Sequence, residues 1–179
     1  MTIQELCKHL QLVYIRNNAE TIIQQARHTK QDYADFLTNI LTHEVERRTA
    51  NGITRRINEA KFPIKKYLVD FDRSKYDAAF APKFQELETL EFIGNKENII
   101  LIGTPGAGKT HYATALGIEA CMRGKSVLFI TVPNLIIELK EAMNQSQLNS
   151  YRKKFERYSL VSLKSSSKAS ECTINLKLA

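Results

Sequence analysis

Residues 97–123, which read ENIILIGTPGAGKTHYATALGIEACMR, decide the fold of this 179-residue chain. Within them, residues 99–102 form a short apolar run of the kind found in buried parallel strands. The run ends at Gly103, and the segment after Thr110 is rich in alanine and other apolar residues that suit a packed helix. The stretch therefore predicts a strand, a glycine-containing loop and a helix in immediate succession.

The loop between this strand and this helix fits the pattern G-x-x-x-x-G-K-[ST], which marks a P-loop in such a setting. Its glycines let backbone N–H groups approach phosphate oxygens, and the helix N-terminus adds partial positive charge. We expect Lys109 to contact the β- and γ-phosphates of a nucleotide and Thr110 to give its hydroxyl to Mg²⁺. The predicted cofactor-binding residues are Gly103, Thr104, Pro105, Gly106, Ala107, Gly108, Lys109, Thr110 and His111. A glycine-rich turn without a ligand, the alternative, would need neither the lysine nor the threonine.

The composition is that of an ordinary soluble protein, with 43% hydrophobic and 25% charged residues. No apolar run is long enough to span a bilayer, and the first ten residues lack the apolar core of a signal peptide. We therefore expect a cytoplasmic protein with no membrane partner. The three cysteines, Cys7, Cys121 and Cys172, are far apart and odd in number, which disfavours a disulfide framework or a metal site.

A net charge of +7 favours polyanionic partners, although charge also serves solubility. Many of the cations lie in residues 45–66, VERRTANGITRRINEAKFPIKK, where only Glu46 and Glu59 oppose them. The functional interpretation is contact with DNA phosphates, and the alternative is a solvated cationic face. The residues predicted to contact DNA are Arg47, Arg48, Arg55, Arg56 and Lys61.

The periodicity of apolar residues predicts the rest of the organisation. Three helices are expected before Pro63, and the third, which begins near Asp32, should bury an apolar stripe in a small bundle. That stripe comprises Tyr33, Phe36, Leu37, Ile40, Leu41 and Val45. After the P-loop helix, we expect a strand at 126–131, a helix at 134–143 and a basic helix at 148–158. Alternation of strands and helices predicts an α/β layer with a parallel sheet.

Taken together, these segments resemble the IstB-like transposition ATPases, which are related to DnaC-like helicase loaders among the AAA+ ATPases. The resemblance covers about residues 1–161 and rests on RRINEAKFP, the DFD connector, GTPGAGKTHYATALG and GKSVLFITVPNLIIELKEA. It implies binding of ATP, Mg²⁺ and DNA, and action as an oligomeric helper of a transposase. Two alternatives stay open: a DnaC-like helicase loader, and a DNA- or partner-binding helical module whose P-loop is merely inherited.

The chain departs from this family where a third strand should end in two adjacent acids. Residues 158–161 begin such a strand, but a serine-rich segment follows, no aspartate occurs after Asp77, and no Asp-Glu pair occurs anywhere. Hydrolysis needs a held Mg²⁺ ion and a carboxylate that orients water. Glu156 and Glu171, in this last part of the chain, do not follow an apolar strand. We therefore predict weak nucleotide affinity, hydrolysis near background and no catalytic residue.

The predicted fold class is α/β, with an N-terminal helical segment followed by an incomplete P-loop NTPase domain of the AAA+ type with a parallel sheet. The predicted segments are 1–66, helical and basic; 67–96, a connector; 97–161, a partial ATP-binding domain; and 162–179, a serine-rich tail. The family's later sensor strand is missing, so we expect the P-loop strand to lack neighbours, which would destabilise the core. A frameshift or premature stop is the hypothesis for the tail, and a genuine flexible tail is the alternative.

Overall fold

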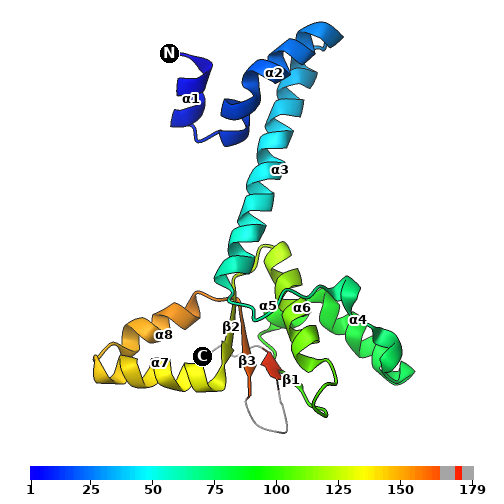
Figure 1. Ribbon diagram of the computed structural model, residues 1–179, viewed down its shortest axis with the longest axis vertical. Coiled ribbons are helices and arrows are strands. Elements are labelled where there is room, and N and C mark those ends of the chain that lie inside the picture. The colour runs from blue at the N-terminus through cyan, green and yellow to red at the C-terminus, as the bar shows by residue number, and fades with distance from the viewer. Residues whose placement is uncertain (166–171, 175–179) are drawn as a thin grey trace. The chain divides into compact units, whose positions relative to one another are not determined.

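The computed structural model describes residues 1–165 and 172–174 and contains two compact units, Met1–Gly52 and Ile53–Ala179 (Figure 1). The first unit holds α1 (Ile3–His9), α2 (Val13–Thr29) and the beginning of α3 (Tyr33–Glu59). The second unit holds the end of α3 and the later elements. These are 3-10 turns at Leu68–Asp70, Arg73–Lys75 and Ala78–Phe80, then α4 (Ala81–Thr89), α5 (Glu91–Asn95), β1 (Ile99–Leu101), α6 (Lys109–Met122), β2 (Val127–Thr131), α7 (Val132–Asn144), α8 (Leu148–Glu156), β3 (Leu160–Lys164) and β4 (Cys172–Ile174).

The core of the first unit follows the helical spacing of its apolar residues. Cys7, Ile15, Ala19 and Ile40 are buried together, and Leu12, Tyr14, Ile22 and Phe36 pack against them. The stripe predicted for the third helix is only partly buried, and the prediction is wrong for Tyr33, Leu37, Leu41 and Val45, which are 86, 56, 51 and 61% exposed. Each step of four residues turns about 40° beyond a full turn of the helix. The predicted stripe therefore winds around α3, and part of it leaves the face that packs on this core.

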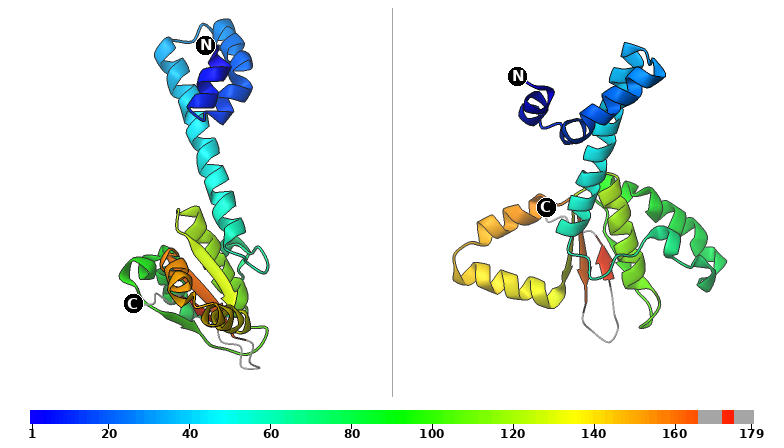
Figure 2. Two further views of the ribbon diagram at one scale, coloured as in Figure 1. Left: turned by 90° about the vertical axis from the view of Figure 1, so that its left-hand side faces the viewer. Right: turned by 45° about the horizontal axis from the view of Figure 1, so that its top comes forward.

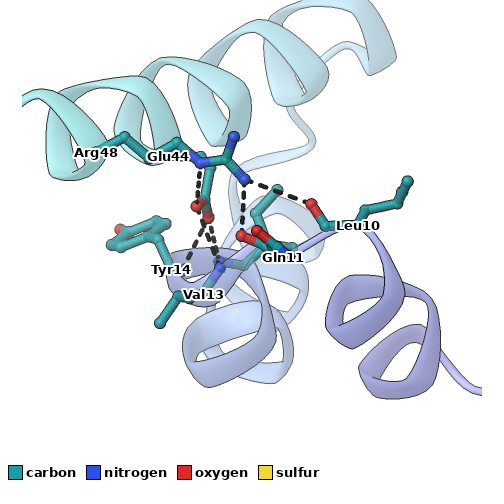
Figure 3. A network of polar contacts seen from close by, with 7 residues as sticks. Leu10, Gln11, Val13, Tyr14, Glu44 and Arg48 are labelled. Atoms are coloured by element: carbon teal, nitrogen blue, oxygen red, sulfur yellow. Dashed lines mark hydrogen bonds and ion pairs between the residues drawn. The ribbon is translucent and has the colours of Figure 1, made fainter. Parts of the chain in front are cut away.

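A buried glutamate holds the first unit together (Figure 3). The side chain of Glu44, in α3, accepts hydrogen bonds from the N–H groups of Val13, Tyr14 and Ile15 at 3.1, 2.8 and 3.1 Å. These are orphan donors of the first turn of α2, which has no side-chain cap at Leu12. A carboxylate from another helix therefore does what an N-cap residue normally does.

Arg48 extends this network on the solvent side. Its Nε donates to Glu44 Oε1 at 3.2 Å, and its Nη2 donates to the carbonyl oxygen atoms of Gln11 at 2.7 Å and Leu10 at 3.4 Å. Burial raises the pKa of Glu44, but the hydrogen bonds from Ile15, Arg48 and Tyr14 outweigh it, so the net pKa is lowered. Glu44 is thus held as an anion between helix α2 and Arg48.

The second unit contains a four-stranded sheet in the order β1-β4-β3-β2. As expected, β2 and β3 are parallel, with Val127 opposite Leu160 and Thr131 opposite Lys164. The strand β4 is antiparallel to both of its neighbours, so the sheet as a whole is mixed. Because β1 and β3 are each antiparallel to β4, the strands β1, β2 and β3 all point the same way.

The expectation that the P-loop strand lacks neighbours is wrong. Residues Ile99–Leu101 pair with Cys172–Ile174, and the same segment pairs with β3 on its other side. Part of the serine-rich tail, residues 162–164 and 172–174, therefore lies in the sheet. The rest of that tail lies outside the described residues, apart from Ser165. The backbone groups of β1 that were expected to be unpaired have partners on one edge, which removes the predicted cost on that side.

Helices pack on the two faces of the sheet according to the alternation of strand side chains. On one face, Val127 and Leu160 join a core with Ala113 and Leu116 of α6, and α6 runs beside the strands in both views of Figure 2. On the other, Leu128, Ile130 and Val161 pack with Phe155 of α8. Among the helices of the described residues, none combines the length and apolarity needed to cross a membrane.

Candidate functional site

The loop between β1 and α6 has the backbone geometry that its glycines permit. Gly106 and Gly108 take φ values of +84° and +77°, in the left-handed region that favours glycine. A Cβ atom at Gly108 would also lie 2.6 Å from Tyr76 Oη, which is too close for any side chain. The same Tyr76 hydroxyl donates to the Ala107 carbonyl at 2.6 Å. The positive φ and the close Tyr76 hydroxyl therefore both favour glycine at position 108.

Lys109 places its ammonium group inside the loop. Its Nζ donates to the carbonyl oxygen atoms of Gly103 and Thr104 at 2.7 and 2.6 Å. The helix α6 starts at Lys109 and has no side-chain cap, so the N–H donors of its first turn are not satisfied by a capping side chain. The loop thus combines a positive charge, a helix N-terminus and backbone N–H groups, the combination that binds anions.

Thr110 and His111 follow on α6 and are both half-buried. The His111 ring lies edge-on to the ring of Phe71, with 5.4 Å between centroids, and its buried Nε2 has no hydrogen-bond partner in the described part of the chain. The predicted residues 103–110 thus form one continuous loop and helix start. His111 contacts the connector.

The connector supports the loop through aromatic side chains that the sequence analysis did not single out. Phe71 packs against Tyr76, Phe84 and Tyr112, with centroid distances of 5.3, 5.6 and 4.7 Å. Burial raises the pKa of Tyr112, so its phenol stays a neutral donor to the Phe84 carbonyl. The closely spaced aromatic residues after the DFD run are the sequence feature that could have pointed to this support. Their contact with the loop could not be predicted, because Tyr76 and Ala107 are 31 residues apart in the sequence.

A groove of about 580 Å³ opens beside this loop. Its walls come from β1, α4, α5 and the loop itself, and they include Phe80, Phe84, Phe92, Ile100 and Lys109. The groove continues from Lys109 in the loop onto an apolar and aromatic surface. Such a surface suits a flat, partly apolar group attached to a phosphate chain.

The described residues offer a poor set of ligands for Mg²⁺. Thr110 supplies one hydroxyl, whereas Mg²⁺ favours carboxylate oxygen atoms together with phosphates and water. The strand β3, where two adjacent acids were expected, ends instead at Lys164, followed by Ser165. No group of three or more His, Cys, Asp or Glu side chains that could hold a metal occurs among residues 1–165 and 172–174. The residues at hand therefore do not fit a protein-anchored magnesium ion.

The five cations predicted to contact DNA differ in their surroundings. Arg48 is bonded to Glu44 and to two loop carbonyls, and Arg56 donates from Nε to the Cys121 carbonyl at 2.9 Å. These two guanidinium groups serve the structure of their own units. Arg47, Arg55 and Lys61 are exposed, and in the described part of the chain the Arg55 guanidinium group has a single ion pair, at 3.9 Å to Glu59.

A strand, a glycine-containing loop with an inward lysine and an uncapped helix define the P-loop class of fold. The chain belongs to the family of IstB-like ATP-binding proteins, whose family model matches residues 5–166. It is 34% identical over 146 residues to the insertion sequence IS5376 ATP-binding protein of Geobacillus stearothermophilus, covering 82% of this chain and 58% of that protein. It is 33% identical over 146 residues to the insertion sequence IS21 ATP-binding protein of Pseudomonas aeruginosa, covering 82% and 55%.

A shorter match joins the chain to the replicative helicase loader DnaC of Escherichia coli, at 45% identity over 56 residues. This match covers 31% of the chain and 23% of DnaC. The chain spans a little over half the length of the two insertion-sequence relatives. The family model establishes the family of this chain. Because the chain covers only part of its relatives, any activity of the whole relatives comes to this chain only as a proposal.

Proposed function

We propose that this chain binds ATP through residues 103–110 and acts as an ATP-binding helper of a DNA transposase. The observation that carries the proposal is the Lys109 ammonium, held 2.7 and 2.6 Å from two loop carbonyls at the start of an uncapped helix. An arriving phosphate would exchange these neutral acceptors for anionic oxygen atoms, which make stronger hydrogen bonds.

Each part of the loop has a place in this proposal. The backbone N–H groups after Gly106 surround the phosphate chain, Lys109 neutralises its β- and γ-phosphates, and Thr110 is the hydroxyl that would contact Mg²⁺. His111 follows this loop on α6 and packs on Phe71 of the connector. The strand β3 ends at Lys164 and not at a carboxylate that could orient a water molecule, so we expect bound ATP to be hydrolysed near the background rate.

ATP binding should stabilise the second unit against unfolding. At ATP concentrations near 100 times the dissociation constant, the gain should be about 2.7 kcal/mol. Thermal melting of the 179-residue chain, followed by circular dichroism with and without ATP, measures it. An unchanged melting temperature at millimolar ATP would contradict the proposed function.

We further propose that exposed cations of α3 contact DNA phosphates. Replacing Arg47 and Arg55 together with alanine should weaken binding to duplex DNA of any sequence. The dependence of log K on log salt concentration should become shallower by about 0.9 per lost phosphate contact. Fluorescence anisotropy between 50 and 200 mM salt would measure both effects.

Lys140→Ala, on the exposed surface of α7, removes a cation that is not part of the proposal and serves as the control. An equal loss in the control would leave the proposed interface without support.

The match to DnaC favours a second candidate, a helicase loader. Both candidates use the same nucleotide loop, so ATP binding does not distinguish them. Co-precipitation distinguishes them: a transposase helper should bring down a transposase of the insertion-sequence class, and a helicase loader should bring down a replicative helicase. A helical binding module with an inherited P-loop is a third possibility, and it predicts DNA binding that ATP leaves unchanged.

A further inference from the structure

Lys164 lies at the edge of the sheet that carries the nucleotide loop. The residue Cys172 of β4 pairs with Leu101, the last residue of β1, and also with Lys164, the last residue of β3. Neighbouring strands are about 4.8 Å apart, so the backbones of Leu101 and Lys164 are about 10 Å apart at the same level of the sheet. In Figure 1, the end of β3 and the loop before α6 lie at the same end of the sheet.

The side chain of Lys164 is on the face of the sheet that α6 covers. Leu160 packs into the core formed with α6, whereas Val161 and Leu163 belong to the cluster on the opposite face. Because strand side chains alternate, Lys164, four residues after Leu160, shares the α6 face. The helix α6 begins with Lys109 after the loop that follows β1, so Lys164 lies on the α6 face of the sheet and ends its strand at the level where β1 ends.

Lys164 is half-buried, and no hydrogen bond or ion pair to its ammonium group is present within residues 1–165 and 172–174. A partly desolvated ammonium group that has no acid among the described residues favours the approach of an anion. The position is also the one at which a carboxylate would help to anchor Mg²⁺. A cation there repels a metal ion and attracts the phosphate oxygen atoms that the metal would otherwise neutralise.

We propose that this chain holds the triphosphate of ATP without Mg²⁺, with the ammonium group of Lys164 taking the place of the metal beside Lys109. The inference rests on the proposed function, because it concerns the same loop. It assigns Lys164 as a phosphate-binding residue and explains why the site can bind ATP and yet lack the ligands for hydrolysis.

Calorimetric titration of the 179-residue chain with ATP, in EDTA and in MgCl₂, tests the inference. The unaltered chain should bind in EDTA with an affinity within about threefold of that in MgCl₂. Lys164→Met should weaken binding in EDTA by about tenfold, the loss expected for one charged hydrogen-bonding partner. Lys164→Asp should bind poorly in EDTA and recover in MgCl₂, because it supplies an anionic oxygen for the metal. Lys125→Met, exposed just before β2, makes the same change in net charge away from the loop and should bind as the unaltered chain does.

The outcomes separate the inference from the proposed function. Absence of ATP binding under both conditions contradicts the proposed function and the inference with it. Binding that requires MgCl₂, or that is the same in Lys164→Met and Lys125→Met, overturns only the inference. Circular dichroism melting of each variant without ATP checks folding. Lys164→Gln, which keeps a polar side chain, replaces Lys164→Met if the latter melts early, and the same tenfold loss is then required.

Discussion

Replacing Lys109 with alanine is expected to lower the affinity for ATP by about 100-fold, equivalent to about 2.7 kcal/mol. The ammonium group is the one full positive charge inside the loop, and its bonds to Gly103 and Thr104 hold it there before any ligand arrives. Alanine removes that charge while preserving the helix, because alanine has the highest helix propensity. Titration with ATP, with Lys125→Ala as the exposed control, measures the loss.

The fold of the variant should be intact, which makes the result interpretable. The buried core around α6 does not include Lys109, so the melting temperature without ATP should change little. An ATP affinity that is unchanged in Lys109→Ala would show that ATP binds elsewhere on the chain. In that case the part of the groove that α4 and α5 line, away from Lys109, would be the site to test next.

Replacing Glu44 with alanine is expected to destabilise the first unit by about 1–3 kcal/mol, the usual cost of leaving buried hydrogen-bond donors without a partner. The change would leave the N–H groups of Val13, Tyr14 and Ile15 without their carboxylate and Arg48 without its counter-ion. Amide hydrogen exchange at residues 13–15 and chemical denaturation would both detect this loss of stability.

The matched control is Glu46→Ala on the same helix, where the carboxylate is 65% exposed and contacts only His43 among the described residues. Its effect should be below about 1 kcal/mol. Equal effects at both positions would contradict the capping role of Glu44.

The same network predicts a loss of stability in acid. The pKa of Glu44 is lowered in the folded chain from its ordinary value of 4.5. A lowered pKa in the folded state stabilises the unit fully above pH 4.5, and this contribution is lost as the pH falls through the folded-state pKa. Denaturation midpoints measured from pH 7 to pH 3 should fall in this acid range. The fall should be smaller in Glu44→Gln, which has no proton to gain.

The local succession around residues 99–122 could be predicted from the sequence because it depends on neighbouring residues. An apolar run, glycines at positions that need positive φ, and an alanine-rich segment specify a strand, a loop and a helix without help from the rest of the chain. The strand at 127–131 and the helices α7 and α8 were predicted for the same reason, and their observed bounds agree to within two residues.

Contacts between distant segments decided what the sequence analysis missed. Arg48 and Arg56 have the same residue type and similar neighbours as Arg47 and Arg55, yet they bond to backbone carbonyls 37 and 65 residues away. Tyr76 acquires its role as a support for the loop from Ala107, 31 residues later. No periodicity in the sequence encodes such pairs, because each one exists only after the segments have packed.

The sequence by itself determined that this chain carries a loop of the P-loop pattern between a strand and a helix, and that it belongs with ATP-binding proteins of insertion sequences. Only the tertiary structure decided that residues 172–174 supply a neighbour for the loop's strand, that Glu44 caps α2, and that Lys164 comes level with the loop. The physical reason is the range of the interactions. Backbone conformation and helix packing faces depend on residues a few positions apart, whereas strand pairing and buried charge depend on segments that meet only in the folded chain.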